Sequence, residues 1–303
     1  MAAYELEPPG GFLNLPAEYT AWERAGVVVL PVPFELSTSY GGGTRRGPAA
    51  LIEASAQVEL YDRELDDEPA LRWGVHTLPP LARELRSPEA ATDAIAAAVE
   101  ELARSGKLPV ILGGEHSISP GVARGLHRVF GDFVTVQLDA HADLRAEYEG
   151  TPHSHACAAA RISKFSPVIQ VGIRSLDVTE MEFIREQPER VRTFWAEDVL
   201  SDPQGVARQV GELVAGKRVF LTLDLDVFDA SIMPSTGTPE PGGLRWHDVL
   251  AQVRAVAEAG DVIGFDCVEL APIPGFHAPD FTAAKLVYKT ISYIMRRRAG
   301  SAP

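Results

Sequence analysis

Short apolar runs alternate with longer amphipathic segments along most of this chain. Six runs rich in Val, Ile, Leu and Phe are strand candidates, at residues 27–34, 108–114, 133–140, 167–173, 218–226 and 262–270. Three segments repeat their apolar positions with the period of a helix, at residues 91–106, 202–217 and 281–298. This alternation predicts an α/β fold built from βα units around a mainly parallel sheet.

The pattern indicates one domain. The 303 residues contain no internal repeat and no linker, and a chain of this length can bury a substantial core. Residues 1–25 show neither the strand nor the helix pattern, so we expect an irregular N-terminal arm over about these residues. We therefore predict a single domain over residues 1–303 that begins with this arm.

The charge of the chain narrows the choice of partners. It has 42 Asp and Glu residues against 28 Lys and Arg, which gives a formal net charge of -14. Such a charge repels nucleic-acid phosphates and anionic lipids, so we expect neither nucleic acid nor membrane as a partner. An acidic chain suits a cationic ligand or bound metal ions, although acidity alone also serves solubility.

The cysteines and the first residues predict a cytoplasmic protein. Cys157 and Cys267 lie far apart in apolar contexts, which is typical of small buried side chains and not of a disulfide framework. No apolar run approaches the ~20 residues that span a bilayer. The start MAAYELEPPGG lacks the basic and apolar regions of a signal peptide.

Ionisable residues gather where the strand candidates end. Four of these ends read ILGGEHS, VQLDAHAD, LTLDLDVFD and FDCVELAP. In parallel sheets, ligands bind beyond the carboxyl ends of the strands, because the loops there emerge from a rigid scaffold. A single D-x-D or D-x-H is more often a helix cap or a turn than a metal site. Four such ends at one edge favour a functional site.

Their chemistry predicts two metal ions. In an extended segment every second side chain points the same way, so we expect Asp139, His141 and Asp143 to converge, and likewise Asp224 with Asp226. Carboxylates packed together without a cation would repel one another. Carboxylate and imidazole ligands without thiolate favour manganese over structural zinc. With His116 there are six candidate ligands, which suits two ions that share carboxylates and activate one water.

These motifs carry a family resemblance. GGEHS (113–117), DAHAD (139–143), SHA (154–156), DLDVFDASIMPSTGTPEPGGL (224–244) and FDCVEL (265–270) resemble, in order and spacing, the motifs of the ureohydrolases, the family of arginase and agmatinase. The similarity runs from YGGGTRRGP (40–48) to the C-terminal helix and is greater to the agmatinase branch. It implies a three-layer α/β/α fold around an eight-stranded parallel sheet, and a homotrimer or homohexamer.

The resemblance also implies how the site is divided. One manganese ion would be held by His116, Asp139, Asp143 and Asp224, and the other by His141, Asp139, Asp224 and Asp226, with Asp139 and Asp224 bridging.

Three further roles follow from the resemblance. His155 is similar to the family's proton-shuttling histidine, and Glu269 to the carboxylate that pairs with the guanidinium group. Thr238 matches a position close to the substrate. Asp143 is expected to be a catalytic residue as well as a metal ligand. His153 stands two residues from His155, and the SHA context favours His155.

The expected reaction is hydrolysis of a guanidino compound to urea and an amine. Glu147 and Glu149, in the loop after DAHAD, would repel an α-carboxylate and attract a distal ammonium, unless both simply face water. This favours agmatine, with putrescine as the product. N1-aminopropylagmatine, giving spermidine, is the main alternative, and guanidino acids and arginine are others.

Two alternative hypotheses about function involve other classes of protein. Amine deacetylases of a similar fold use a related set of ligands with one zinc ion, but they would not need His116, Asp143 and Asp226 together. A metal-binding relative without catalysis would not need His155 and Glu269.

Overall fold

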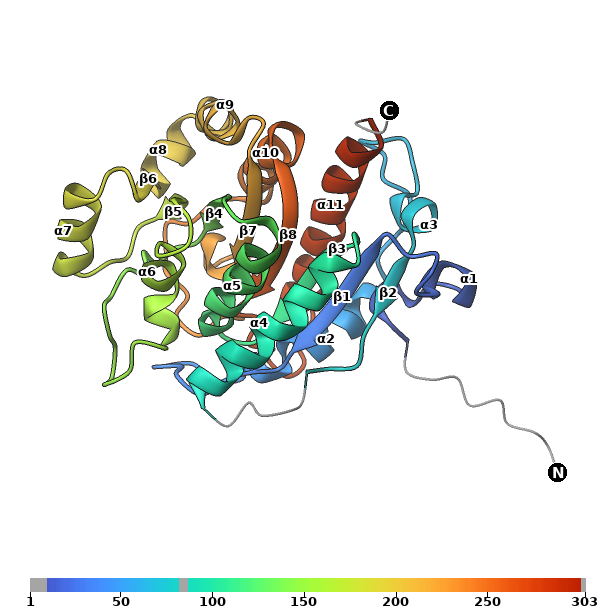
Figure 1. Ribbon diagram of the computed structural model, residues 1–303, viewed down its shortest axis with the longest axis horizontal. Coiled ribbons are helices and arrows are strands. Elements are labelled where there is room, and N and C mark those ends of the chain that lie inside the picture. The colour runs from blue at the N-terminus through green and yellow to red at the C-terminus, as the bar shows by residue number, and fades with distance from the viewer. Residues whose placement is uncertain (1–9, 82–86, 301–303) are drawn as a thin grey trace.

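The computed structural model describes residues 10–81 and 87–300. Within them, eight strands form one parallel sheet in the order β2-β1-β3-β8-β7-β4-β5-β6 (Figure 1). The strands are β1 (Val27–Val32), β2 (Val75–Thr77), β3 (Leu108–Gly113), β4 (Val134–Leu138), β5 (Val168–Ile173), β6 (Val191–Trp195), β7 (Arg218–Asp224) and β8 (Asp261–Val268).

Helices cover both faces of this sheet (Figure 1). They are α1 (Ala17–Thr20), α2 (Gly47–Ser55), α3 (Pro69–Trp73), α4 (Pro88–Arg104), α5 (Ser119–Phe130), α6 (Ala158–Ile162), α7 (Val178–Glu186), α8 (Ala196–Ser201), α9 (Pro203–Val214), α10 (Trp246–Ala259) and α11 (Ala278–Gly300). Short 3-10 turns are η1 (Phe12–Asn14), η2 (Thr44–Arg46), η3 (His116–Ile118), η4 (His155–Cys157) and η5 (Leu225–Val227).

Two apolar clusters make the layers. Val27 and Val29 of β1 belong to the cluster packed under α2, α9, α10 and α11, whereas Val28 and Leu30 belong to the cluster under α4, α5 and α6. Successive side chains of a strand point to opposite faces, so both faces of a covered strand must be apolar. This explains why the strands appear as continuous apolar runs. The expected three-layer α/β/α architecture is confirmed.

The helices begin where the sequence supplies caps. The Ser87 hydroxyl accepts a hydrogen bond from the Ala90 amide at 3.2 Å, and an Asp202 carboxylate oxygen accepts one from the Gly205 amide at 2.8 Å. A proline follows each of these caps, at the first helical position, where its missing N–H costs nothing. The three segments expected to be helical form α4, α9 and α11.

The apolar pattern identified six of the eight strands. It missed β2 and β6, which are the two edge strands of the sheet. β2 has only three residues, and β6 alternates buried Val191 with exposed Arg192 in a way that a search for long apolar runs overlooks. Short, partly polar strands are common at sheet edges.

The expected N-terminal arm lies partly outside the described residues, at residues 1–9. From Gly10 onward it packs against the domain. Phe12 and Leu13 are buried in the core cluster that contains α2, and the Leu13 amide donates to the Ser55 hydroxyl at 2.7 Å. Both cysteines are buried and free. No helix among the described residues is long and apolar enough to cross a membrane.

A partly buried charged cluster joins α11 to the loop before α3. The Lys289 ammonium lies 2.8 Å from an Asp62 carboxylate oxygen and 2.7 Å from a Glu64 oxygen. The Tyr293 hydroxyl donates to the same Glu64 oxygen at 2.6 Å. Because Lys289 and Asp62 are both buried, each depends on the other to offset the loss of water.

Lys289→Met should therefore lower the free energy of unfolding by about 3–5 kcal/mol, because it leaves the Asp62 carboxylate buried without its cation. Denaturant unfolding followed by circular dichroism measures this. Arg104→Met is the matched control, since it breaks an exposed ion pair with Glu100 and should cost at most about 1 kcal/mol. Equal effects of the two substitutions would contradict this account of the cluster.

Candidate metal centre and active site

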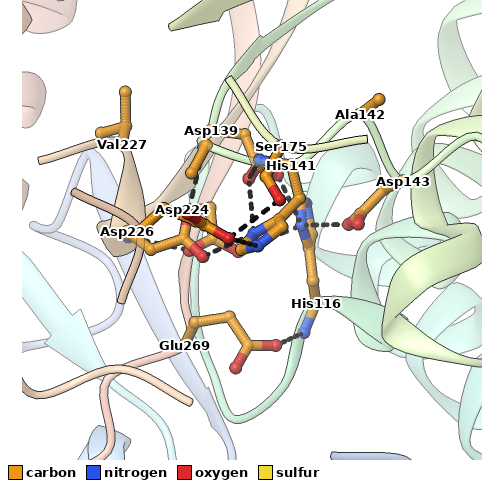
Figure 2. Close-up of polar contacts among 12 residues, drawn as sticks. His116, Asp139, His141, Ala142, Asp143, Ser175, Asp224, Asp226, Val227 and Glu269 are labelled. Atoms are coloured by element: carbon orange, nitrogen blue, oxygen red, sulfur yellow. Dashed lines mark hydrogen bonds and ion pairs between the residues drawn. The ribbon is translucent and has the colours of Figure 1, made fainter. Parts of the chain in front are cut away.

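The site residues come from four strands that are neighbours in the middle of the sheet. These strands stand in the order β3-β8-β7-β4. The segments after their carboxyl ends bring together His116, Glu269, Asp224, Asp226, Asp139, His141 and Asp143 (Figure 2). The four polar strand ends noted in the sequence thus do meet at one edge.

One nitrogen of His116 lies at the centre of the first group. Its Nδ1 is 3.1 Å from Asp139 Oδ2, 3.0 Å from Asp143 Oδ2 and 3.2 Å from Asp224 Oδ2 (Figure 2). This nitrogen is buried and has no well-aligned hydrogen bond in the described part of the chain. The other ring nitrogen, Nε2, lies 3.0 Å from the Thr222 hydroxyl. Of the three carboxylate oxygens, Asp139 Oδ2 also accepts a hydrogen bond from the Gln137 side-chain amide at 2.7 Å. A nitrogen without a hydrogen bond and three converging carboxylate oxygens are donors suited to a cation.

A second group surrounds His141. Its Nδ1 lies 2.9 Å from Asp226 Oδ2 and 3.8 Å from Asp139 Oδ1. The other Asp226 oxygen accepts from the Ala140 amide at 3.0 Å, which fixes the carboxylate. Asp139 belongs to both groups of residues that could hold a metal ion. The donor set therefore fits two neighbouring ions that share a carboxylate.

The convergence has a different cause from the one expected. The sequence predicted strands that reach residues 140 and 226, with alternation placing the ligands on one side. In the structure β4 ends at Leu138 and β7 at Asp224. Asp226 lies in η5, and Asp143 has φ +52°, in the left-handed region. The candidate ligands beyond the strand ends are directed by turns and not by strand alternation.

Burial and neighbouring charges shift the pKa values of these groups. Loss of water, together with the charges of Asp226 and Asp143, raises the pKa of Asp139 to about 7. Burial also raises the pKa of Asp224 well above its ordinary value. Burial opposes the charged form of His141, but the neighbouring carboxylates, Asp226 first, raise its pKa to about 11. Without a cation the site therefore holds protons.

Glu269 lies below His116, where β8 leaves the sheet. Its φ is +66°, and its amide donates to the Gly114 carbonyl at 2.8 Å. Oxygen Oε1 accepts from the His116 amide (Figure 2), so Oε2 is the freer of the two oxygens. Burial, with the charge of Glu115, raises the pKa of this carboxyl well above its usual range. A cation beside it would favour its ionised form.

A cavity of about 220 Å³ adjoins the ligands. Its lining includes four residues predicted from the sequence, namely His141, Asp143, His155 and Thr238. The lining also contains residues to which the sequence had given no role: Ser39, Arg145, Tyr148, Ala156, Ser175, Leu176 and Glu180.

The loop after DAHAD contributes differently from what was expected. Glu147 and Glu149 are exposed and do not line the cavity, so the alternative that they face water holds. Arg145 and Tyr148 of the same loop do line it, and the Arg145 guanidinium lies over the Tyr148 ring at 5.1 Å. The sequence offered all four residues in one segment, and it gave no sign of which side chains face the cavity.

A family model described as "Arginase family" matches residues 25–292. The chain is a member of the arginase family. It is 38% identical over 300 residues to an N(1)-aminopropylagmatine ureohydrolase of Synechocystis sp., covering 95% of this chain and 97% of that protein. It is 33% identical over 260 residues to an agmatinase of Bacillus subtilis, covering 83% and 86%.

A solved structure agrees. The agmatine ureohydrolase of Thermoplasma volcanium superposes with a TM-score of 0.86 at 27% identity, covering 98% of each chain. Membership of the arginase family makes this protein a ureohydrolase, a hydrolase of guanidino compounds in a family of binuclear metal enzymes. The deacetylase and non-catalytic alternatives are set aside by the same matches.

The protonated carboxyls predict how stability depends on pH. Without metal, the protein should become less stable as the pH rises from about 4 to 7, because the pKa of Asp139 is about 7 when folded but near 3.8 when unfolded. In that window the folded form retains a proton that the unfolded form has released, which costs about 1.4 kcal/mol per pH unit.

Thermal unfolding after chelation, at several pH values between 4 and 7, measures this slope. Asp139→Asn is the control and should make this slope shallower, while Asp224 and Glu269, whose pKa values are also raised, retain part of it. A melting temperature of the metal-free parent that climbs across the window would argue against the proposed protonation of Asp139.

Proposed function

We propose that this ureohydrolase hydrolyses N1-aminopropylagmatine to urea and spermidine. Four relatives at 35–38% identity carry the name N(1)-aminopropylagmatine ureohydrolase. The structural observation that supports this proposal is the charge of the cavity, which suits a substrate tail with ammonium groups. Agmatine, which shares the guanidino end and has a shorter cationic tail, is the second candidate, supported by the match to agmatinases.

The cavity lining favours cations over carboxylates. Glu180 places a buried carboxyl group on it, beside Asp143, which is a proposed metal ligand. Arg145 is the guanidinium of the lining, but its nitrogens already face Asp177 at 3.8 Å and Glu180 at 3.7 Å. A substrate α-carboxylate would therefore meet acidic groups and an arginine that is already paired. An amine tail would meet complementary charge.

We propose two Mn²⁺ ions as the cofactor, in the ligand division implied by the family motifs. Oxygen and imidazole donors without a thiolate support manganese over structural zinc. When bound, the two ions supply a strong nucleophile at neutral pH by lowering the pKa of water. His116 would serve one ion, His141 and Asp226 the other, and Asp139 both, as its position between the two groups supports.

Two other residues have tasks on the substrate itself. The free oxygen of Glu269 would bind the guanidinium group, since a planar cation and a carboxylate make charge-assisted hydrogen bonds. His155 would carry a proton to the departing amine nitrogen, a task suited to an imidazole at neutral pH. Thr238 lines the same cavity and would contact the substrate.

Three further expectations are the homotrimer or homohexamer, which rests on the family resemblance, the cytoplasmic location, which rests on the cysteines and the N-terminal residues, and the identity of the metal, which rests on the donor types. Light scattering and elemental analysis of the purified protein test the first and the last.

The substrate assignment predicts an order of activities. With manganese-loaded protein, kcat/KM for urea release should be highest for N1-aminopropylagmatine and next for agmatine. It should be at least about 10-fold lower for arginine and guanidinobutyrate, because their carboxylates meet acidic groups. A colorimetric urea assay with all four compounds measures this. Arginine as the best substrate would overturn the charge argument.

The roles of the two histidines predict different losses. His155→Ala should lower kcat by about 10²–10⁴-fold with metal content unchanged, because it removes a proton carrier and no ligand. His116→Ala should instead lower the metal content of the purified protein towards one ion. Elemental analysis beside the urea assay separates the two. Loss of metal from the His155 variant would contradict its role.

A further inference from the structure

Glu115, in the GGEHS motif, has no role in the site so far described. It is fully buried, and its carboxylate accepts hydrogen bonds from the loop after β1. Oxygen Oε2 accepts from the Leu36 amide at 2.9 Å and the Ser37 amide at 2.8 Å. Oxygen Oε1 accepts from the Ser37 hydroxyl at 2.7 Å and from the Ser117 hydroxyl. Glu115 therefore fixes the position and the hydroxyl direction of Ser37.

Ser37 in turn contacts His155, which comes from a different loop. Its hydroxyl oxygen accepts from the His155 amide at 3.0 Å and lies 3.4 Å from the ring nitrogen Nδ1. A hydroxyl has one proton, and the short contact with a carboxylate is the stronger of its two choices. The Ser37 hydroxyl thus gives its proton to Glu115 and presents lone pairs to His155.

A lone pair facing Nδ1 selects one form of the neutral ring. The contact is favourable only when Nδ1 carries the hydrogen, so Nε2 is then the nitrogen without one. The Tyr148 ring packs edge-on against the imidazole, with centroids 5.9 Å apart, and limits its rotation. His155 also lines the cavity, so its ring lies beside the space where a substrate would bind.

We propose that Ser37 and Glu115 are positioning residues that keep the proton of His155 on Nδ1. Nε2 is then free to take a proton during hydrolysis and to release it to the departing amine. The water consumed supplies this proton, and the ring returns to its starting form. This inference rests on the proposed role of His155. It gives a role to Glu115, the buried glutamate of GGEHS, which accepts four hydrogen bonds.

Ser154 provides a matched control. Its hydroxyl lies 3.3 Å from the same Nδ1, yet no hydrogen bond from it to a carboxylate is found among the described residues. If any neighbouring hydroxyl sufficed, Ser37 and Ser154 would be equivalent. If the carboxylate behind Ser37 matters, only the Ser37 variant should respond.

The test combines nitrogen-15 NMR of labelled histidine with steady-state kinetics on the manganese-loaded protein. NMR of the metal-free parent should show His155 with its hydrogen on Nδ1, and Ser37→Ala should give a mixture of both forms. Ser37→Ala should lower kcat for urea release by about 10–100-fold, with KM changed less than about twofold, because binding groups are untouched. Metal content should match the parent, and the melting temperature should show a folded protein that is somewhat less stable, because Glu115 loses one donor.

Two more variants sharpen the result. Ser37→Thr keeps the hydroxyl and should restore kcat to within about threefold, whereas Ser154→Ala should stay within about twofold of the parent. Glu115→Gln should lower kcat, as Ser37→Ala does, provided that the melting temperature of this variant shows a folded protein.

Three results would overturn the inference: a parent His155 with its hydrogen on Nε2, an unchanged kcat in Ser37→Ala, or an equal loss in Ser154→Ala. If the parent released no urea from any guanidino compound, the proposed function would fail, but the NMR form of His155 would still decide this inference.

Discussion

Repulsion among buried carboxylates is the constraint on which the rest of this structure depends. Asp139, Asp143 and Asp224 are almost fully buried around a single imidazole nitrogen. When they are brought together without a metal ion, protons offset their repulsion, as the raised pKa values of His116, Asp139 and Asp224 indicate. The fold must therefore provide a frame rigid enough to hold groups that would otherwise separate. A bound cation would offset the repulsion between the carboxylates. The relief of this repulsion would add to the affinity of the site for the metal.

The parallel sheet supplies that frame. The four strands that carry site residues are contiguous in its centre, and both faces of these strands are covered by helices. Backbone contacts across the strand ends, such as the Glu269 amide with the Gly114 carbonyl at 2.8 Å, continue the ladder into the site. The two edge strands, β2 and β6, supply no residue to the groups that could hold a metal ion. They also have the weakest apolar pattern.

The sequence was sufficient for the fold class and for the residues that meet at the site, because long apolar runs and clustered carboxylates are strong local signals. It was insufficient wherever side-chain direction depends on turns. Asp226 and Asp143 converge with the other ligands through η5 and a left-handed residue, and not by strand alternation. For the same reason the outward direction of Glu147 and the inward direction of Arg145 could not be distinguished.

The hydrogen bonds of Glu115 to Ser37 were also beyond the sequence, because the two residues are 78 positions apart. Nothing in the local pattern around Ser37 indicates a partner in the segment that follows β3. Such pairs become visible only when the order of the strands is known, since β1 and β3 are neighbours in the sheet.

Asp143 and Glu269 both have left-handed backbone conformations, with φ of +52° and +66°. For residues other than glycine this costs about 1–3 kcal/mol each. Glycine would relieve that cost but would remove a carboxylate from the site. Selection for activity and selection for stability therefore oppose each other at these two positions. In a homologous protein that is no longer selected for activity, we expect glycine or asparagine to replace these two residues. Such a protein should be more stable to heat and catalytically inactive.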